Sequence, residues 1–452
     1  KRLELSFNNL GPVGAITLCK ALRENTRVEE VAMSNNRIGD KGGLAFAELI
    51  KHSETLRELD LGDNEISDEG GVALMQAAKV SPPMKDLRNA VIEGSHTLSR
   101  LMLYGNECGA ATMASFARAV RKNKTLEADL TDNPIGDDGL PHLAAILRKH
   151  WLQKRLDVRS MAFAHEGLRK LAVALAIGSF RTISTLYLSN NPLGTEGAKH
   201  VALILEKNLA LTDLDLSGCS LGDTGTRIVC NALLENEGVE KIDLGDNDIS
   251  DLGVAALASA LGKKGKKSVL NPLLNPLTVK SVCLTTNAIT SDGLAAYSGI
   301  INVCNLVSIE MSTCKITDEG CKVLATYLWR NTSVKMLDLS SNLLTADGMW
   351  GMVDAMCKNK HLEILRLNDN RLLDSGGRGI ATVLSKNYSL KEVNVAGNGI
   401  GPNGVIPITK ALSCREVGVE VWLNGNQFLQ DYRAKASVEL LMKRNPIATV
   451  YT

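Results

Sequence analysis

The chain has 452 residues, of which 44% are apolar and 4% aromatic, and its 51 basic and 50 acidic residues leave a net charge of +1. This apolar fraction excludes a disordered chain and, with few aromatic residues, indicates an aliphatic core. The balanced charge argues against coating a nucleic acid, for which a basic excess is typical. The ten cysteines form no C-x-x-C pair and no metal-like spacing, so we expect reduced thiols in a cytoplasmic compartment and no cofactor.

One phrase, L-x-x-L-x-L-x-x-N-x-I/L, recurs along the chain in fifteen copies that are mostly 28 residues apart. Its alternating L-x-L predicts a short strand with one face inward. The Asn is expected to hydrogen-bond the backbone of the tight bend that follows, and Cys219 and Cys314 replace it in two copies. Clean copies are Leu56–Ile66, Val239–Ile249, Val334–Leu344 and Leu362–Leu372.

Most copies of the phrase are followed by a glycine and an apolar run with helical period, as in Gly253–Leu261. Asp68 and Asp251, just ahead of such runs, are expected to be helix N-caps. One strand and one helix cannot bury their apolar faces alone, so the units must stack. The sequence therefore predicts an α/β horseshoe solenoid over residues 1–428, with a parallel sheet on its concave face and helices on its convex face.

The chain departs from the repeat at three places. Extra residues near 79–96 separate the third and fourth copies, and extra residues near 262–278 separate the ninth and tenth. Both should emerge on one rim, either as tolerated surface insertions or as loops that add contacts. Between them, Asp129–Phe163 is irregular because Asn133 comes one residue early and Met161 replaces the anchor Asn. This stretch is interpreted either as an irregularity in curvature or as a docking edge.

The second insert carries Lys263, Lys264, Lys266 and Lys267. This cluster is either a solvated charge run or a site for phosphates or an acidic protein tail. It does not match a phosphate-binding P-loop. Residues 429–452 read as a C-terminal cap, with a helix at Asp431–Arg444 and a short terminal strand.

In each strand, the residue between the two inward positions should point out of the concave face. This column is mostly acidic and then changes character at Arg366 and Trp422. A ladder of carboxylates would steer a basic ligand surface, and an exposed Trp is frequent in interface hot spots. The alternative is that Asp merely solubilises the sheet. The candidate protein-binding residues are Asp60, Asp129, Asp157, Asp215, Asp243, Glu310, Asp338, Arg366 and Trp422.

The 28-residue strand–helix unit resembles the ribonuclease-inhibitor class of leucine-rich repeats. Similar arrays occur in NOD-like receptors, in the GTPase-activating protein of Ran and in axonemal proteins. The resemblance implies a protein-binding scaffold or adaptor within a multiprotein assembly, and the narrower hypothesis is a cytoskeletal or axonemal complex. The expected partners are proteins, with neither nucleic acid nor membrane among them.

Two alternatives stay open beside the scaffold. A Ran-type activator of a small GTPase typically adds a long acidic tail, and the end of this chain reads differently. A NOD-like sensor array would require a nucleotide-binding module upstream. The chain opens inside a repeat at Lys1–Leu5, so we expect that its natural N-terminus lies further upstream. No catalytic motif is present, so we expect no enzymatic activity, and no apolar stretch reaches the roughly 18–20 residues of a membrane span.

Overall fold

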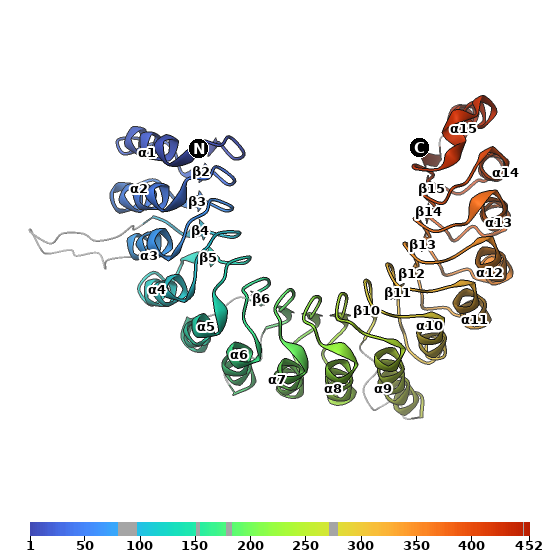
Figure 1. Ribbon diagram of the computed structural model, residues 1–452, viewed down its shortest axis with the longest axis horizontal. Coiled ribbons are helices and arrows are strands. Elements are labelled where there is room, and N and C mark those ends of the chain that lie inside the picture. The colour runs from blue at the N-terminus through green and yellow to red at the C-terminus, as the bar shows by residue number, and fades with distance from the viewer. Residues whose placement is uncertain (80–96, 151–153, 178–182, 271–278, 446) are drawn as a thin grey trace, which may run out of the picture. The chain divides into compact units, whose positions relative to one another are not determined.

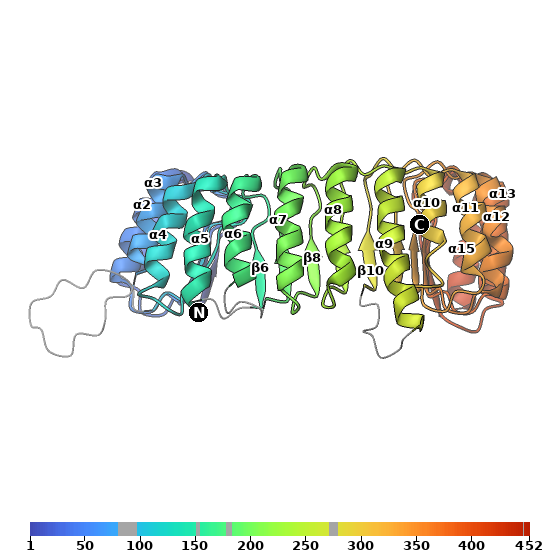
Figure 2. The ribbon, with the colours of Figure 1, turned by 90° about the horizontal axis from the view of Figure 1, so that it is seen from below.

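The protein is described here by a computed structural model that covers residues 1–79, 97–150, 154–177, 183–270, 279–445 and 447–452. It forms two compact units, Lys1–Leu211 and Thr212–Thr452. Within each unit the strands line one side and the helices the other, as Figures 1 and 2 show. The predicted α/β solenoid of strand–helix repeats is therefore confirmed, and its strand copies occur where the recurrent phrase places them.

The first unit alternates strands and helices along the chain. Strands β1 to β5 form a five-stranded parallel sheet, and β6 pairs with β7. The elements are β1 (Arg2–Glu4), α1 (Gly11–Leu22), β2 (Glu30–Ala32), α2 (Gly39–His52), β3 (Glu58–Asp60), α3 (Asp68–Ala77), β4 (Arg100–Met102), α4 (Ala110–Val120), β5 (Glu127–Asp129), α5 (Gly136–His150), β6 (Arg155–Asp157), α6 (His165–Ile177), β7 (Thr185–Tyr187) and α7 (Gly194–Lys207).

The second unit continues the same alternation, and each of its strands from β8 to β16 lies parallel to the next. The elements are β8 (Asp213–Asp215), α8 (Gly222–Glu235), β9 (Lys241–Asp243), α9 (Asp251–Leu270), β10 (Ser281–Cys283), α10 (Ser291–Ser298), β11 (Ser308–Glu310), α11 (Asp318–Leu328), β12 (Met336–Asp338), α12 (Ala346–Lys358), β13 (Ile364–Arg366), α13 (Leu373–Lys386), β14 (Glu392–Asn394), α14 (Pro402–Ser413), β15 (Val419–Trp422), the 3-10 turn η1 (Gln427–Gln430), α15 (Tyr432–Arg444) and β16 (Ala448–Tyr451).

The anchor asparagines after the exposed Asn8 are buried, and they tie their repeats to the preceding ones. The Asn191 side chain donates to the carbonyl oxygens of Val158 and Leu188 at 2.9 and 2.8 Å, and its Oδ1 accepts from the Met161 N–H at 3.0 Å. The tight bends place these peptide groups out of reach of a ladder partner, so the amide satisfies them instead. The predicted backbone bonding of the Asn is confirmed, and it also reaches the preceding repeat.

The predicted N-caps are wrong in detail. Asp68 is the first residue of α3, and the residue that caps this helix is Ser67, whose side chain accepts from the Glu69 N–H. Asp251 is likewise the first residue of α9. Its carboxylate accepts from the N–H and the hydroxyl of Thr290 at 2.8 and 2.6 Å, and from the Gly293 N–H at 3.0 Å. Each Asp thus holds the N-terminus of the following helix, where the helix dipole favours a negative charge.

The Asp251 carboxylate should stabilise the start of α10. Replacing Asp251 with alanine should destabilise α10 by about 1–3 kcal/mol, because two backbone N–H groups lose their acceptor. Hydrogen exchange should speed up at residues 290–298. Asp292→Ala is the matched control, since this exposed carboxylate lies in the first turn of the same helix. Unchanged exchange in α10 of the Asp251 variant would contradict the assigned role.

The irregular stretch at Asp129–Phe163 coincides with a break in the sheet. Strand β5 ends one sheet and β6 begins another, although the Gly136 N–H still donates to the Met161 carbonyl just beyond the strands at 2.9 Å. Ala128 stands at the centre of β5, where other strands carry Leu, Ile or Val. This smaller side chain fills less space beneath the strand, and Met161 offers no amide in place of the anchor Asn.

The two inserts have different outcomes. The second was expected to be a rim loop, but α9 continues to Leu270, so its first part extends a helix. Residues 271–278 and 80–96 lie outside the described part of the chain. At the C-terminus, β16 pairs with β15 from Val419↔Ala448 to Trp422↔Tyr451, which extends the sheet by one strand. No helix among the described residues is long and apolar enough to cross a membrane.

Candidate protein-binding surface

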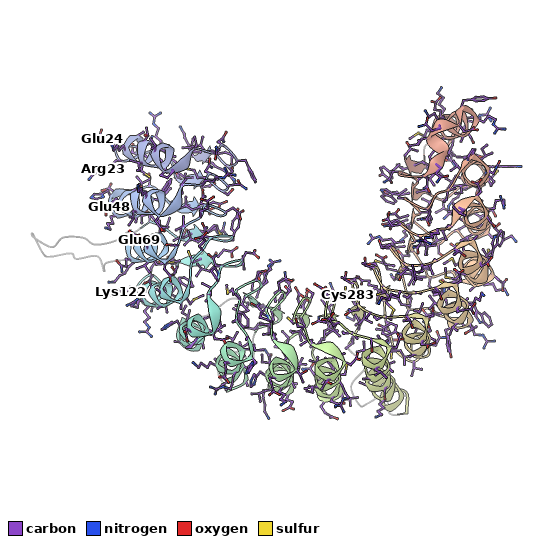
Figure 3. The ribbon with its side chains drawn as sticks, in the orientation of Figure 1. Arg23, Glu24, Glu48, Glu69, Lys122 and Cys283 are labelled. Atoms are coloured by element: carbon purple, nitrogen blue, oxygen red, sulfur yellow. The ribbon has the colours of Figure 1, made fainter. Side chains whose placement is uncertain are left out.

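The predicted column of outward residues forms one continuous line in the second unit. Strand register places Asp215 beside Asp243, Asp243 beside Cys283, and Cys283 beside Glu310. The line continues through Asp338, Arg366, Asn394, Trp422 and Tyr451. Figure 3 shows Cys283 on the strand side of the unit, away from the helices. Neighbours in such a line are about 5 Å apart.

Hydrogen bonds within the chain hold several of these carboxylates in place. Asp215 Oδ1 accepts from the N–H and the hydroxyl of Ser217 at 2.9 and 2.7 Å. Asp338 makes the same pair of bonds with Ser340 at 3.0 and 2.5 Å. The recurrent Asp thus has a structural role in closing the turn after the strand.

Among the column's acids in the second unit, Asp338 lies near Arg366, whereas Asp215, Asp243 and Glu310 have no ion-pair partner among the described residues. Burial raises the pKa of Asp243 above its ordinary value, and the carboxylates of Asp215 and Glu310 raise it further. These acids therefore repel one another on a surface where water only partly screens them. A cation brought to this surface by a partner would relieve the repulsion.

The column is less uniform in the first unit than the sequence suggested. Burial raises the pKa of Asp60, and hydrogen bonds from Gly62 and Tyr104 partly offset this increase. Asp129 Oδ1 accepts hydrogen bonds from the N–H and the hydroxyl of Thr131 at 3.0 and 2.8 Å. Asp157 instead binds two arginines, Arg155 at 2.8 Å and Arg159 at 2.7 Å. The ladder of free carboxylates is thus interrupted, because residues flanking the column carry compensating charge.

The change in residue character at Arg366 and Trp422 also differs from what we expected. Arg366 donates to Glu392 at 2.8 Å and lies 4.0 Å from Asp338, so these carboxylates neutralise it. Trp422 was expected to be exposed, but it is half-buried and stacks on Tyr451 with ring centroids 4.6 Å apart. Together the two rings form an aromatic surface at the C-terminal end of the sheet.

A hollow of about 510 Å³ lies at the sheet break of the first unit. Met102, Phe116 and Met161 contribute to its apolar lining. Arg100 and Arg155 also line it, and Arg100 pairs with Glu58 and Glu127 at 3.4 and 3.7 Å. A concave apolar site bordered by a few charged groups is typical of binding sites.

Several residues of these surfaces were missed from the sequence. Arg155 and Arg159 both approach the face of Tyr187, with guanidinium carbons 4.7 and 5.8 Å from the ring centre. Tyr451 was also missed, as were Met113, Phe116 and Leu143 in the lining of the hollow, although Asp129, Asp157 and Met161 there had been singled out. The only available signals were the small Ala128 and the absence of an Asn at Met161.

Of the lysine cluster in the second insert, the structure describes the side chain of Lys263. Lys263 is an exposed residue of α9, on the helix side. The side chains of Lys264, Lys266 and Lys267 lie outside what the structure describes. Their binding role stays a prediction.

Among the described residues, the strand side offers neither a metal-binding cluster nor a reactive thiol. No group of three or more His, Cys, Asp or Glu side chains there could hold a metal ion. The cysteines are free, and burial raises the pKa of Cys283 to about 12, which keeps this thiol protonated.

Comparison with known proteins supports the fold. A leucine-rich-repeat family model matches ten segments: residues 1–19, 24–47, 52–75, 122–144, 181–202, 207–226, 235–258, 304–325, 358–381 and 386–408. The chain is therefore a member of the leucine-rich-repeat family, a fold that typically serves as an interaction scaffold. A search of curated proteins found no match.

Solved structures with related folds share little sequence with this chain. An internalin from Listeria monocytogenes is 15% identical, with 96% of each chain covered and a TM-score of 0.39. TLR13, from its complex with ssRNA13, is 16% identical over 90% of this chain and 54% of its own, with a TM-score of 0.47. Actin-binding site 2 of leiomodin-1 is 20% identical over 33% of this chain and 87% of its own, with a TM-score of 0.28.

Proposed function

We propose that this protein is a scaffold or adaptor that holds other proteins against the strand side of its sheet. The observation that carries the proposal is the line of carboxylates Asp215, Asp243 and Glu310, which occupy adjacent register positions or flank Cys283. These acids have no basic partner among the described residues. A partner with a basic surface would fit them, and attraction between the two would speed its association.

The hollow at the sheet break would add an apolar anchor in the first unit. Met102 and Met161 line it, and methionine side chains adapt to different shapes. A partner side chain inserted there would bury apolar area next to Arg100 and Arg155. Hot spots of interfaces are commonly such apolar pockets surrounded by polar groups.

The proposed repeat class and the proposed kind of assembly are based on the 28-residue strand–helix unit. A spacing of 28 residues with a full α-helix in most repeats favours the ribonuclease-inhibitor class. Through that class, we propose a cytoplasmic assembly of several proteins, with a cytoskeletal or axonemal complex as the specific candidate.

The proposed role of Asp243 predicts a conflict between stability and binding. Asp243→Asn should raise the free energy of unfolding by roughly 0.5 kcal/mol at pH 7, because it removes a half-buried charge that neighbouring acids repel. The amide oxygen can still accept the Gly245 N–H, which lies 2.8 Å from Asp243 Oδ1. The same variant should bind a basic partner more weakly. Thermal unfolding and partner titration measure the two effects.

The pH dependence has a definite sign. The pKa of Asp243 is higher in the folded chain than in the unfolded chain, so folding favours the protonated form. The stabilisation by Asp243→Asn should therefore vanish in acid, below the ordinary carboxyl pKa, and be complete above the raised one. Asp246→Asn, at an exposed acid of the same repeat, should leave stability unchanged. A loss of stability in Asp243→Asn at pH 7 would refute the repulsion.

Affinity capture followed by mass spectrometry tests the function itself. The wild type should retain a set of proteins that Asp215→Lys/Asp243→Lys loses. Glu319→Lys/Asp354→Lys is the matched control on the helices, where these side chains are 74% and 81% exposed. Equal retention by both double variants would oppose binding at the strand side. Stimulated GTP hydrolysis by a captured GTPase would replace the pure scaffold with a GTPase regulator.

A further inference from the structure

A groove runs along the helix side of the second unit, opposite to its strands. It lies over α12, α13 and α14, the neighbouring helices at the right of Figure 1. Its volume is about 590 Å³. Small side chains such as Ala381 and Ala411 contribute to its lining, and the ring of Pro407 adds apolar surface. The groove therefore offers a largely apolar surface between helices that pack side by side.

All the charges that line this groove are positive. Arg378 on α13 and Lys410 on α14 are exposed, and neither has an ion-pair partner among the described residues. Arg415 also lines the groove, and its guanidinium donates to main-chain carbonyls, including that of Leu384 at 3.0 Å. Carbonyl groups carry no net charge, so this cation is not neutralised. The groove thus joins an apolar surface to an uncompensated positive potential.

An aromatic side chain lies at each end of the groove. Trp350 is 44% exposed, and its indole N–H donates to the Ser375 hydroxyl at 3.2 Å, near the start of α13. Tyr388 follows the end of α13 and is 51% exposed. Arg415 approaches its ring face at 5.5 Å, which limits how the ring can turn. Exposed Trp and Tyr rings held in position supply contact area at little entropic cost.

We propose that this groove binds an acidic amphipathic helix of a partner protein. Its apolar side chains would lie between Trp350 and Tyr388, and its carboxylates would pair with Arg378 and Lys410. The binding site lies on different elements from the strand-side surface, so it goes beyond the proposed scaffold function. The protein would then hold separate partners on its two sides.

The dimensions of the groove agree with such an occupant. Arg378 and Tyr388 are ten residues apart along and just past α13, which corresponds to about 15 Å at helical rise. This length accommodates roughly three turns of a bound helix, with anchors at positions i, i+4 and i+7. Two cations without an ion-pair partner among the described residues favour acidic residues on the flanks of those anchors.

A random peptide display library provides an unbiased probe, because it does not require the natural partner. Peptides of 16 residues are selected on the full chain, and the enriched ones are titrated by fluorescence anisotropy. We expect acidic sequences with apolar residues three or four apart. Their affinity should fall at least tenfold for Arg378→Glu/Lys410→Glu. Arg227→Glu is the matched control, since Arg227 is exposed and follows Gly225 on α8 as Arg378 follows Gly376 on α13.

Cys414 adds a readout that needs no variant. It is exposed and lines the groove, so a bound peptide should slow its alkylation by iodoacetamide. The proposal is overturned if selection yields no acidic amphipathic peptides, if Arg227→Glu weakens binding as much, or if bound peptides leave Cys414 alkylation unchanged. Retention of strand-side partners by Arg378→Glu/Lys410→Glu keeps this test separate from that of the scaffold function.

Discussion

Replacing Asn247 with leucine should destabilise the second unit by about 3–4 kcal/mol, a large effect for one substitution. This anchor Asn is fully buried. It donates to the carbonyls of Leu216 and Gly245 at 2.8 Å each, and accepts from the N–H groups of Cys219 and Leu221 at 3.1 Å each. Leucine would remove the Asn247 partner from all four buried groups, of which the Gly245 carbonyl still accepts from the Gly218 N–H at 2.9 Å. Hydrogen exchange across α8 and α9, read by mass spectrometry, measures the loss.

The chain itself supplies the control for this prediction. Cys314 occupies the anchor position of another repeat, and its thiol can donate to the carbonyls of Leu284 and Ser312 at 3.6 and 3.5 Å. Asn247→Cys should therefore cost less than Asn247→Leu. If leucine were tolerated as well as cysteine, polar satisfaction of the turn would not be what stabilises the stack.

The second large effect is expected at Arg415. Arg415→Met should lower the free energy of unfolding by about 2–4 kcal/mol, because it leaves buried carbonyls at the end of α13 without a donor. The Arg415 side chain is buried and donates to the carbonyls of Leu384, Asn387 and Leu390, and also to Val417. Burial without a nearby carboxylate lowers its pKa. Local hydrogen exchange at residues 384–390 measures the effect.

Asparagine should partly rescue this position. Asn387 performs the same task one repeat earlier, where its amide donates to the carbonyls of Met356 and Asn359 at 2.7 and 2.9 Å. Arg415→Asn can reach the equivalent carbonyls of Leu384 and Asn387, but not that of Leu390. It should therefore be more stable than Arg415→Met. The opposite order would show that packing of the side chain, rather than its donors, dominates.

Much of the fold could be predicted from the sequence because each part of the repeat has a local cause. The alternating Leu positions determine the strands, and the anchor Asn determines the bend. Contacts between repeats were harder to foresee. Asp251 was assigned to its own helix, whereas its carboxylate bonds Thr290 on the next repeat, which follows an insert. The same bond joins Asp223 to Ser250 at a spacing of 27 residues, and the insert lengthens this spacing to 39 at Asp251.

The site was predicted less completely than the fold. The strand register could be predicted, and so could the column that contains Asp215 and Asp243. The sequence did not reveal that the negative charge of Asp157 in this column is neutralised, because Arg155 and Arg159 occupy positions beside the column. The groove on the helix side depends on side chains from three repeats, such as Trp350, Tyr388 and Lys410. No single motif contains them, so only the packed structure brings them together.

Carboxyl footprinting of the complex with a captured partner tests the central claim most directly. Carbodiimide coupling is compared with and without the partner, and modification of each acid is read by mass spectrometry. We predict that the partner protects Asp215, Asp243 and Glu310, while the exposed helix acids Glu319 and Asp354 react equally in both samples. Protection of Glu319 and Asp354 with unchanged labelling of Asp215, Asp243 and Glu310 would contradict binding at the strand side.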